Sequence, residues 1–355
     1  MTTVALDGRG AERGPEAIIA GARAAAEDGI RLRVFGDPDA LAPVGEIGGA
    51  ELVTAPDEIT NADEPVAAVR SRPEASVVMA ARDVAEGRSD AVASAGPTGA
   101  TMTAALFALR RLHGVRRPAL ALQLAVPGRT GPPTVLLDAG ANTEARAIDL
   151  VQFAYLGAAF SRAVLGVAEP RVALLSVGEE AGKGRRDVTE AHERLAASSG
   201  HEAGQGAPGI DFRGNLEGRD LLQQKADVIV TDGFTGNVVL KTIEGTARAV
   251  ADAVRAAARS GPRAAAGGLL LRPSLGGLRR QMDPDSTGGA ILLGLRGAAV
   301  VGHGSSGPAG IANAVRLAAR TVDQRAVELT AALLEGSGMT RGAMRGELSP
   351  AGSES

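Results

Sequence analysis

Residues 226–245 read Ala226-Asp-Val-Ile-Val-Thr-Asp-Gly-Phe-Thr-Gly-Asn-Val-Val-Leu-Lys-Thr-Ile-Glu-Gly245, and this stretch decides how the fold is interpreted. Its start, Asp227–Thr231, is a short apolar and β-branched run that predicts a buried strand. The next five residues include two glycines, which predict a turn with unusual backbone angles. Beyond them the spacing becomes helical, with apolar residues on or near one stripe at Val238, Ile243, Ala247, Val250 and Val254.

This order of strand, glycine-rich turn and helix offers free backbone N–H groups and the positive end of a helix dipole to a ligand above the sheet. It indicates an anion site, although the same residues also fit an ordinary strand-to-helix turn. The pattern recurs at Gly96-Pro-Thr-Gly99, after the apolar run Ala91–Ser94 and before a helix predicted over Ala100–Leu112. The chain contains 48 glycines, which explains the number of such loops but not the shared Gly-x-Thr-Gly sequence.

The composition is that of a soluble globular protein. The 355 residues are 45% apolar and 22% charged, with a formal net charge of −3, so no nucleic-acid-binding surface is expected. Cysteine is absent, which excludes disulfides, thiolate metal ligands and cysteine nucleophiles. The start of the chain does not resemble a signal peptide, and no uninterrupted apolar run approaches the ~18 residues of a membrane span. We therefore expect a cytoplasmic protein.

Lysine is rare in this chain. Of the 38 basic residues 35 are arginine, and the three lysines are Lys183, Lys225 and Lys241. Lys183 lies in the glycine-rich loop Gly178-Glu-Glu-Ala-Gly-Lys-Gly184. A compact ammonium suits some chemistry better than a planar guanidinium does, so a lysine in such a loop is a candidate catalytic residue.

The predicted elements alternate between strand and helix. This order indicates a mostly parallel, doubly wound sheet with helices on both faces. Five glycine-rich loops follow strands, and in such a sheet they gather on one edge, where ligands bind.

We interpret residues 1–334 as a single catalytic domain, residues 198–209 as a surface loop and residues 335–355 as a disordered tail. Predicted strands cover residues 3–6, 32–35, 91–94, 135–137, 172–176, 227–231 and 298–301; residues 43–60 are weakly patterned, and the last helix covers 309–334.

Residues 251–285 form a second unusual region. A helical segment breaks at Gly261-Pro262, and beyond it leucines are interleaved with arginines, with no acidic residue between Asp252 and Asp283. Such a pattern suits a membrane surface, where leucines enter the acyl boundary and arginines meet anionic lipid. A dimer contact or a helical hairpin on the core is the competing interpretation, and the residues alone favour it slightly. The residues concerned are Leu269, Leu270, Leu271, Leu275, Leu278, Arg263, Arg272, Arg279 and Arg280.

The loops carry no recognisable nucleophile–base pair. The four histidines are scattered, none has a metal-ligand partner three or four residues away, and only His303 lies in a glycine-rich loop. The loop around Lys183 lacks the hydroxyl residue that a P-loop requires, and the first loop misses the dinucleotide-binding spacing by one residue. An anion cradle that holds phosphate beside an electrophile fits these residues, because positioning and charge neutralisation can supply most of such a barrier.

Six segments occur in a recognisable order along residues 3–334. They are Ser94-Ala-Gly-Pro-Thr-Gly-Ala100, Asp138-Ala-Gly-Ala-Asn142, Gly178-Glu-Glu with Lys183-Gly184, Asn215-Leu-Glu-Gly-Arg-Asp220, Thr231-Asp-Gly-Phe-Thr-Gly-Asn237 and His303-Gly-Ser-Ser306. Together they resemble the bacterial acyl-ACP:phosphate acyltransferases, the PlsX family.

This resemblance implies transfer of a fatty acyl group from acyl carrier protein to inorganic phosphate, which makes acyl phosphate for phospholipid synthesis without a cofactor. It also implies a three-layer α/β/α sandwich related to phosphotransacetylases and isocitrate-dehydrogenase-like enzymes, with a protruding helical hairpin over about residues 245–285. A homodimer and peripheral attachment to a membrane surface through Leu269–Leu278 are implied as well.

On this basis we predict how phosphate and the acyl-pantetheine arm bind. Lys183 offsets the charge of phosphate, an oxygen of which attacks the thioester carbonyl, while N–H groups near Gly236 and the Asn237 amide stabilise the oxyanion. His303 or Ser305 orients phosphate or assists the leaving thiolate. No metal is expected. The predicted catalytic residues are Lys183, Asn237 and His303, and the predicted substrate-binding residues are Asp7, Gly96, Thr98, Gly99, Asn142, Asp232, Thr235, Gly236, Ser305 and Ser306.

Some positions depart from the family pattern. The first loop, Asp7-Gly-Arg-Gly-Ala-Glu-Arg-Gly-Pro15, lacks the second Gly, the second Asp and the His of the family, Pro97 replaces an asparagine, and Thr287 replaces an aromatic residue. Two other functions therefore stay open. One is acyl-CoA:phosphate transfer of a small acyl group, as in phosphotransacetylases, and the other is that of a catalytically impaired regulatory or scaffold homologue.

Overall fold

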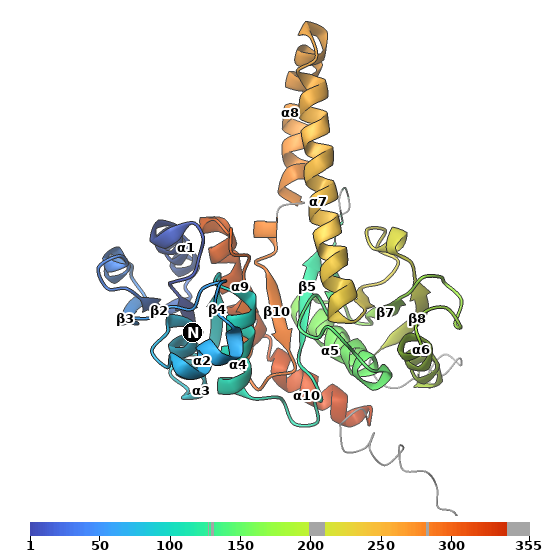
Figure 1. Ribbon diagram of the computed structural model, residues 1–355, viewed down its shortest axis with the longest axis horizontal. Coiled ribbons are helices and arrows are strands. Elements are labelled where there is room, and N and C mark those ends of the chain that lie inside the picture. The colour runs from blue at the N-terminus through green and yellow to red at the C-terminus, as the bar shows by residue number, and fades with distance from the viewer. Residues whose placement is uncertain (127, 129–130, 199–209, 282–283, 339–355) are drawn as a thin grey trace, which may run out of the picture.

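A single β-sheet organises the chain (Figure 1). In the computed structural model, which describes residues 1–126, 128, 131–198, 210–281 and 284–338, eleven strands follow the order β3-β2-β1-β4-β11-β10-β5-β6-β9-β7-β8. Their bounds are β1 Thr3–Asp7, β2 Arg31–Gly36, β3 Ala50–Thr54, β4 Ala91–Ser94, β5 Ala119–Leu124, β6 Thr134–Leu137, β7 Arg171–Leu175, β8 Asp211–Leu216, β9 Val228–Val230, β10 Ala290–Leu293 and β11 Ala298–Val301.

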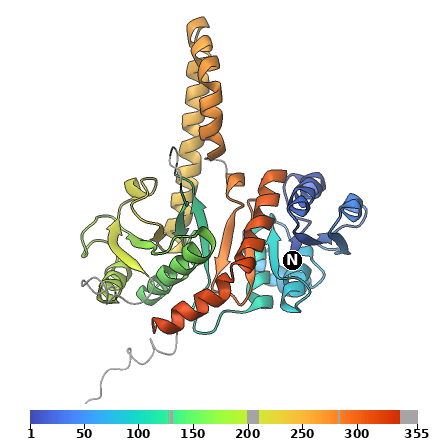
Figure 2. The ribbon, with the colours of Figure 1, turned by 180° about the vertical axis from the view of Figure 1, so that it is seen from behind.

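Helices cover both faces of this sheet, as Figures 1 and 2 show from opposite sides. Helices α1, α5, α6, α9 and α10 pack together on one face, and α2, α3, α4 and the start of α7 lie on the other. The predicted three-layer α/β/α sandwich is therefore confirmed. The helices are α1 Gly14–Glu27, α2 Pro65–Ser71, α3 Ser76–Ala85, α4 Thr98–Leu109, α5 Ala147–Leu165, α6 Arg186–Ser198, α7 Gly233–Ala258, α8 Pro262–Gln281, α9 Pro308–Asp323 and α10 Ala326–Gly336, with 3₁₀ turns at Ala42–Glu46, Gly218–Asp220 and Pro284–Ser286.

Strand direction reverses across the middle of the sheet. One group of parallel strands consists of β1–β4 and β11, and a second group consists of β6, β9, β7 and β8. Three antiparallel pairings separate the two groups: β10 with β11, β10 with β5 and β5 with β6. The carboxyl ends of the two groups consequently point to opposite edges. The expectation that all the glycine-rich loops gather on one edge is therefore wrong. Chain segments from the two groups meet instead over the central strands.

Helix α7 begins earlier than the glycines predict. Gly233 and Gly236 already belong to its first turn, and Asp232 caps it by accepting a hydrogen bond from the Thr235 N–H at 2.9 Å. Neither glycine has a positive φ, so the predicted turn with unusual backbone angles is wrong. Both glycines let the start of α7 pack closely against the loop after β6. A Cβ at Gly236 would lie 1.9 Å from the Asp138 carbonyl oxygen, and a Cβ at Gly233 would lie 2.6 Å from the Asn142 carbonyl oxygen.

Other predicted boundaries also change. The last helix is two helices, α9 and α10, separated at Arg325, whose φ is 51°. Strand β3 lies in the weakly patterned region 43–60, and β5, β8 and β10 were not predicted. Residues 335 and 336 end α10. Residues 199–209 and 339–355, which hold most of the predicted surface loop and tail, lie outside the described residues, as do the side chains of Leu275, Leu278, Arg279 and Arg280.

Helices α7 and α8 form the predicted hairpin, which projects away from the sheet (Figure 1). The 26 residues of α7 give it a length of about 39 Å. Near the free end of the hairpin the helices approach closely, since a Cβ at Gly268 would lie 2.8 Å from that of Ala258. Because the hairpin projects, the alternative of a hairpin packed on the core is excluded.

Helix α5, unlike the projecting hairpin, is almost entirely buried. Within the described residues it is the one helix that is long and apolar enough to cross a membrane, and 83% of its apolar window is buried inside the protein. Tyr155, Phe153 and Phe160 on this helix are among the largest fully buried side chains. It serves here as the central helix of the core.

The close approach at Gly236 predicts a specific loss of stability. Gly236→Ala should lower the free energy of unfolding by about 2–3 kcal/mol or more, because the clash is with backbone that cannot rotate away. Gly245→Ala on the same helix is the control, since no atom lies within 4 Å of the place that a Cβ would take there, and it should raise stability by up to about 1 kcal/mol. Urea denaturation of both variants measures this, and equal stabilities would contradict the packing argument.

Candidate functional site

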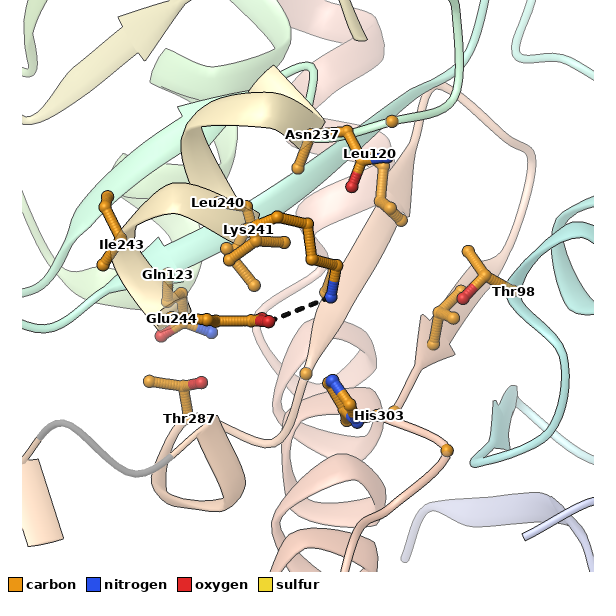
Figure 3. Close-up of a pocket in the computed structure, with 18 of the residues that line it drawn as sticks. Thr98, Leu120, Gln123, Asn237, Leu240, Lys241, Ile243, Glu244, Thr287 and His303 are labelled. Atoms are coloured by element: carbon orange, nitrogen blue, oxygen red, sulfur yellow. Dashed lines mark hydrogen bonds and ion pairs between the residues drawn. The ribbon is translucent and has the colours of Figure 1, made fainter. Parts of the chain in front are cut away.

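A cavity of about 460 Å³ lies over the central strands, where the two groups of strands meet (Figure 3). Its apolar floor includes Leu120 and Leu122 from β5, Ala290 from β10 and Val301 from β11. Its walls come from the loop after β4, the loop after β6, the loop after β11 and helix α7. An apolar floor beneath polar walls is typical of sites that bind a partly apolar small molecule.

Four predicted site residues line this cavity: Gly96, Thr98, Asn237 and His303. Gly96 lies just before α4, Thr98 begins that helix, Asn237 belongs to the first turns of α7, and His303 follows β11. Gly140 brings the loop after β6 beside α7, since a Cβ at Gly140 would lie 3.7 Å from the Asn237 Cβ. Predicted residues from both groups of strands therefore line one cavity.

Lys241 is the important lining residue that sequence analysis did not select. It follows Asn237 by four residues, which places both on one side of α7. Its Nζ lies 3.0 Å from Glu244 Oε2. Figure 3 shows this nitrogen extending into the cavity on the side where the His303 ring lies. Among the described lining residues, Lys241 is the one lysine or arginine. Its rarity and its helical spacing from Asn237 are signals that could have revealed it.

Lys183, by contrast, does not line the cavity. It is exposed in the loop after β7, where its N–H donates to the Glu180 carbonyl at 3.0 Å and its carbonyl accepts from Ser176 Oγ at 2.8 Å. The structure therefore does not bring Lys183 together with Asn237 and His303. It brings Lys241 there instead.

The orientation of His303 is set by Ser305. The Ser305 backbone N–H donates to His303 Nδ1 at 3.3 Å, and Ser305 Oγ lies 2.8 Å from the same nitrogen. Because a backbone N–H can only donate, Nδ1 is the acceptor, and a neutral ring carries its proton on Nε2. His303 is thereby arranged to donate a hydrogen bond. Ser306 is buried and donates its N–H to the His303 carbonyl at 2.9 Å, so both serines support the loop.

Asp138 is a buried carboxylate that shapes the wall beside Asn237. Its Oδ1 accepts from the N–H groups of Leu120, Gly140 and Ala141, and its Oδ2 accepts from the N–H and the side-chain amide of Asn142, all within 3.0 Å. Burial raises the pKa of this carboxyl, and these donors oppose that rise. Asn142, predicted to bind substrate, is thus committed to Asp138 and to the Pro118 carbonyl, which its amide meets at 2.8 Å.

The remaining predicted residues also lie behind the cavity wall. Asp232 caps α7 and pairs with Arg185 at 2.6 Å, and Thr235 Oγ1 donates to Asp232 at 2.9 Å. Gly236 allows α7 to approach Asp138, and Gly99 allows α4 to approach Pro65, whose Cγ would lie 2.7 Å from an added Cβ. None of these residues lines the cavity.

Asp7 supports the opposite wall. Its carboxylate accepts from Ser76 Oγ at 2.6 Å and Ser94 Oγ at 2.7 Å, and Ser94 Oγ in turn accepts from the Gly96 N–H at 3.0 Å. Burial raises the pKa of Asp7 to about 6, although these hydrogen bonds and one from the Arg9 N–H oppose the rise. Asp7 therefore positions the Gly96 loop without lining the cavity. No cluster of three His, Asp or Glu side chains suited to a metal occurs in the described part of the chain.

The raised pKa of Asp7 predicts how stability changes with pH. The folded protein holds this proton more tightly than the unfolded chain, whose Asp pKa is about 3.8, so ionisation favours unfolding. Between about pH 4 and pH 6.5 the wild type should lose up to about 3 kcal/mol of unfolding free energy relative to Asp7→Asn. Urea titrations at several pH values test this. Parallel pH profiles for the two proteins would show that Asp7 does not titrate in this range.

Comparison with known proteins places this geometry in a family. The family described as "Fatty acid synthesis protein" matches residues 2–329. Proteins named "Phosphate acyltransferase" from Thermobifida fusca (strain YX) and Gloeobacter violaceus (strain ATCC 29082 / PCC 7421) are 45% and 39% identical to the chain over 319 and 330 residues. These matches cover 89% and 92% of this chain and 86% and 94% of the relatives.

Solved structures share the fold at much lower identity. A branched-chain phosphotransacylase from Enterococcus faecalis V583 superimposes with a TM-score of 0.57 at 16% identity, covering 91% of this chain and 99% of that one. The EutD phosphotransacetylase from Staphylococcus aureus gives 0.55 at 16% identity, covering 90% and 94%. These structures confirm the predicted fold relationship, and the sequence matches show the family. The chain belongs to the fatty acid synthesis protein family, that of the bacterial phosphate acyltransferases which its six sequence segments resemble.

Proposed function

We propose that the cavity transfers a fatty acyl group from acyl carrier protein to inorganic phosphate and so produces acyl phosphate for phospholipid synthesis. The observation that carries this proposal is the convergence of Asn237, Lys241 and His303 above an apolar floor, in a chain that belongs to the phosphate acyltransferase family. The polar groups suit phosphate and a thioester carbonyl, and the floor suits an acyl chain.

Phosphate binds, in this proposal, beside Thr98, Lys241 and His303. Lys241 takes the charge-neutralising role that sequence analysis gave to Lys183, because its ammonium reaches the cavity. The start of α4 adds backbone N–H groups, although Pro97 contributes none. Positioning and charge neutralisation together raise the local concentration of an otherwise weak nucleophile.

The reaction is an acyl transfer without a covalent enzyme intermediate. A phosphate oxygen forms a bond to the thioester carbonyl carbon, and the tetrahedral oxyanion is stabilised by the Asn237 amide. The carbon–sulfur bond then breaks, and the thiolate of the pantetheine arm leaves with a proton from the phosphate or from water. His303, with its Nε2–H available, orients phosphate or donates a hydrogen bond to the departing sulfur.

The acyl donor that the protein prefers distinguishes the proposed function from its alternatives. Acetyl-CoA as the preferred donor would support a phosphotransacetylase-like activity, and long-chain acyl-ACP supports the proposal. Absence of phosphate-dependent thiol release from either donor would identify a catalytically impaired homologue. The apolar floor of the cavity favours a long acyl group.

Lys241→Gln should lower kcat/KM for phosphate about 100-fold, because it removes the charge that offsets the phosphate. Lys183→Gln is the matched control, since it makes the same change at an exposed residue outside the cavity, and it should change kcat/KM less than about twofold. Phosphate-dependent release of thiol from palmitoyl-ACP measures both. The reverse order of effects would return the charge-neutralising role to Lys183.

We further propose that the protein is cytoplasmic, that its hairpin attaches it to membranes and that it is a homodimer. Leu269, Leu270 and Leu271 on α8 are 67%, 82% and 57% exposed, and the neighbouring Arg263 and Arg272 are also exposed. Exposed leucines beside arginines suit insertion into an anionic bilayer surface. On α7, the exposed Val250 and Val254 offer apolar surface that a second copy could cover.

Replacement of Leu269, Leu270 and Leu271 by serine should reduce co-sedimentation with vesicles containing anionic phospholipid by about fivefold or more, because the apolar area that enters the bilayer is lost. Activity in solution should stay near that of the wild type. Val177→Ser/Leu329→Ser, which removes exposed apolar residues elsewhere, is the control and should sediment normally. Unchanged sedimentation of the triple variant would reject the membrane role.

A further inference from the structure

Two apolar rows face each other across the cavity. Strand β5 contributes Leu120, Leu122 and Leu124, which share one face of the sheet because alternate residues of a strand do. Helix α7 contributes Leu240, Ile243 and Ala247, at spacings that keep them near one side of a helix. All six side chains line the cavity.

The two rows begin together at the proposed reaction centre. Asn237 lies beside Gly140, and the neighbouring Ala139 N–H donates to the Leu120 carbonyl at 2.8 Å. Further along, Ile243 packs against the cluster that contains Leu124. From Leu120 to Leu124 the strand row spans about 13 Å, and from Leu240 to Ala247 the helix row spans about 11 Å, so the rows have similar lengths. An elongated apolar ligand that starts at Asn237 can therefore contact both rows.

The opposite end of the site is polar. A second cavity of about 360 Å³ adjoins the first and shares Gly10, Asn61 and Pro97 with it. Its lining includes Arg9, which pairs with Asp37 at 3.1 Å, together with Glu58 and Thr60. An amide-containing arm suits that side, and an acyl chain suits the side between β5 and α7. The two cavities thus give the donor a direction.

We infer that the acyl chain of the donor lies between β5 and α7, with its far carbons beside Ala247, and that the size of residue 247 limits the chain length. The inference rests on the proposed acyl transfer and adds the subsite and its limiting residue. Alanine leaves this end of the cavity open, and a large side chain there would occupy the space of the distal carbons of a long chain. A short chain ends before it reaches this residue.

Ala247→Phe tests the subsite with octanoyl-ACP and palmitoyl-ACP as donors and inorganic phosphate as acceptor. The ratio of kcat/KM for palmitoyl-ACP to that for octanoyl-ACP should fall about tenfold or more, since the cost of overfilling an apolar pocket grows with each excluded methylene. Ala249→Phe is the matched control: Ala249 is exposed on the same helix, is absent from the cavity lining, and should keep the wild-type ratio.

Ala247→Leu provides a second, smaller change and should give an intermediate ratio, with melting temperatures showing that both variants fold. An unchanged ratio in folded Ala247→Phe and Ala247→Leu, while the wild type makes acyl phosphate, would overturn the subsite alone. A wild type that makes no acyl phosphate from either donor would overturn the proposed function and the subsite with it.

Discussion

The contact between the first turn of α7 and the loop after β6 is the constraint on which the site depends. A glycine at 236 lets the helix approach the Asp138 carbonyl so closely that no side chain fits between them. The Asp138 carboxylate holds the same loop through five donors. The approach sets where α7 starts, and the start of α7 determines where Asn237 and Lys241 lie. A side chain at position 236 would displace the helix and move both residues away from His303.

The reversal of strand direction explains why the cavity lies over the sheet and not at one edge. Each group of parallel strands leads into one helix with Gly-x-Thr-Gly at or just before its start, α4 in one group and α7 in the other. Strands β5 and β10 join the groups through antiparallel pairings and provide the floor. The site is thus built from two similar halves, with a carboxylate behind each wall: Asp7 behind the Gly96 loop and Asp138 behind the Gly140 loop.

Local patterns predicted the layers and several site residues, and long-range pairing decided the rest. Apolar runs followed by glycine identified β1, β4 and β9, and the Thr-Gly sequences pointed to Thr98 and Asn237. The antiparallel pairing of β5 with β10 joins residues about 170 positions apart, which no local pattern reveals. Lys183 and Lys241 both lie near glycines in the sequence. The course of the loop after β7 leaves the first exposed outside the cavity, and the packing of α7 over the central strands brings the second into the cavity with His303.

The ion pair between Lys241 and Glu244 bears on whether the product can acylate the protein. The acyl phosphate that we propose forms beside Lys241 is a mixed anhydride, which reacts readily with neutral amines. Lys241 Nζ is paired with Glu244 Oε2 at 3.0 Å, and an amine nitrogen that carries its third proton has no free electron pair with which to capture the acyl group. In the proposed reaction, this pairing opposes acylation of the same lysine that attracts the phosphate.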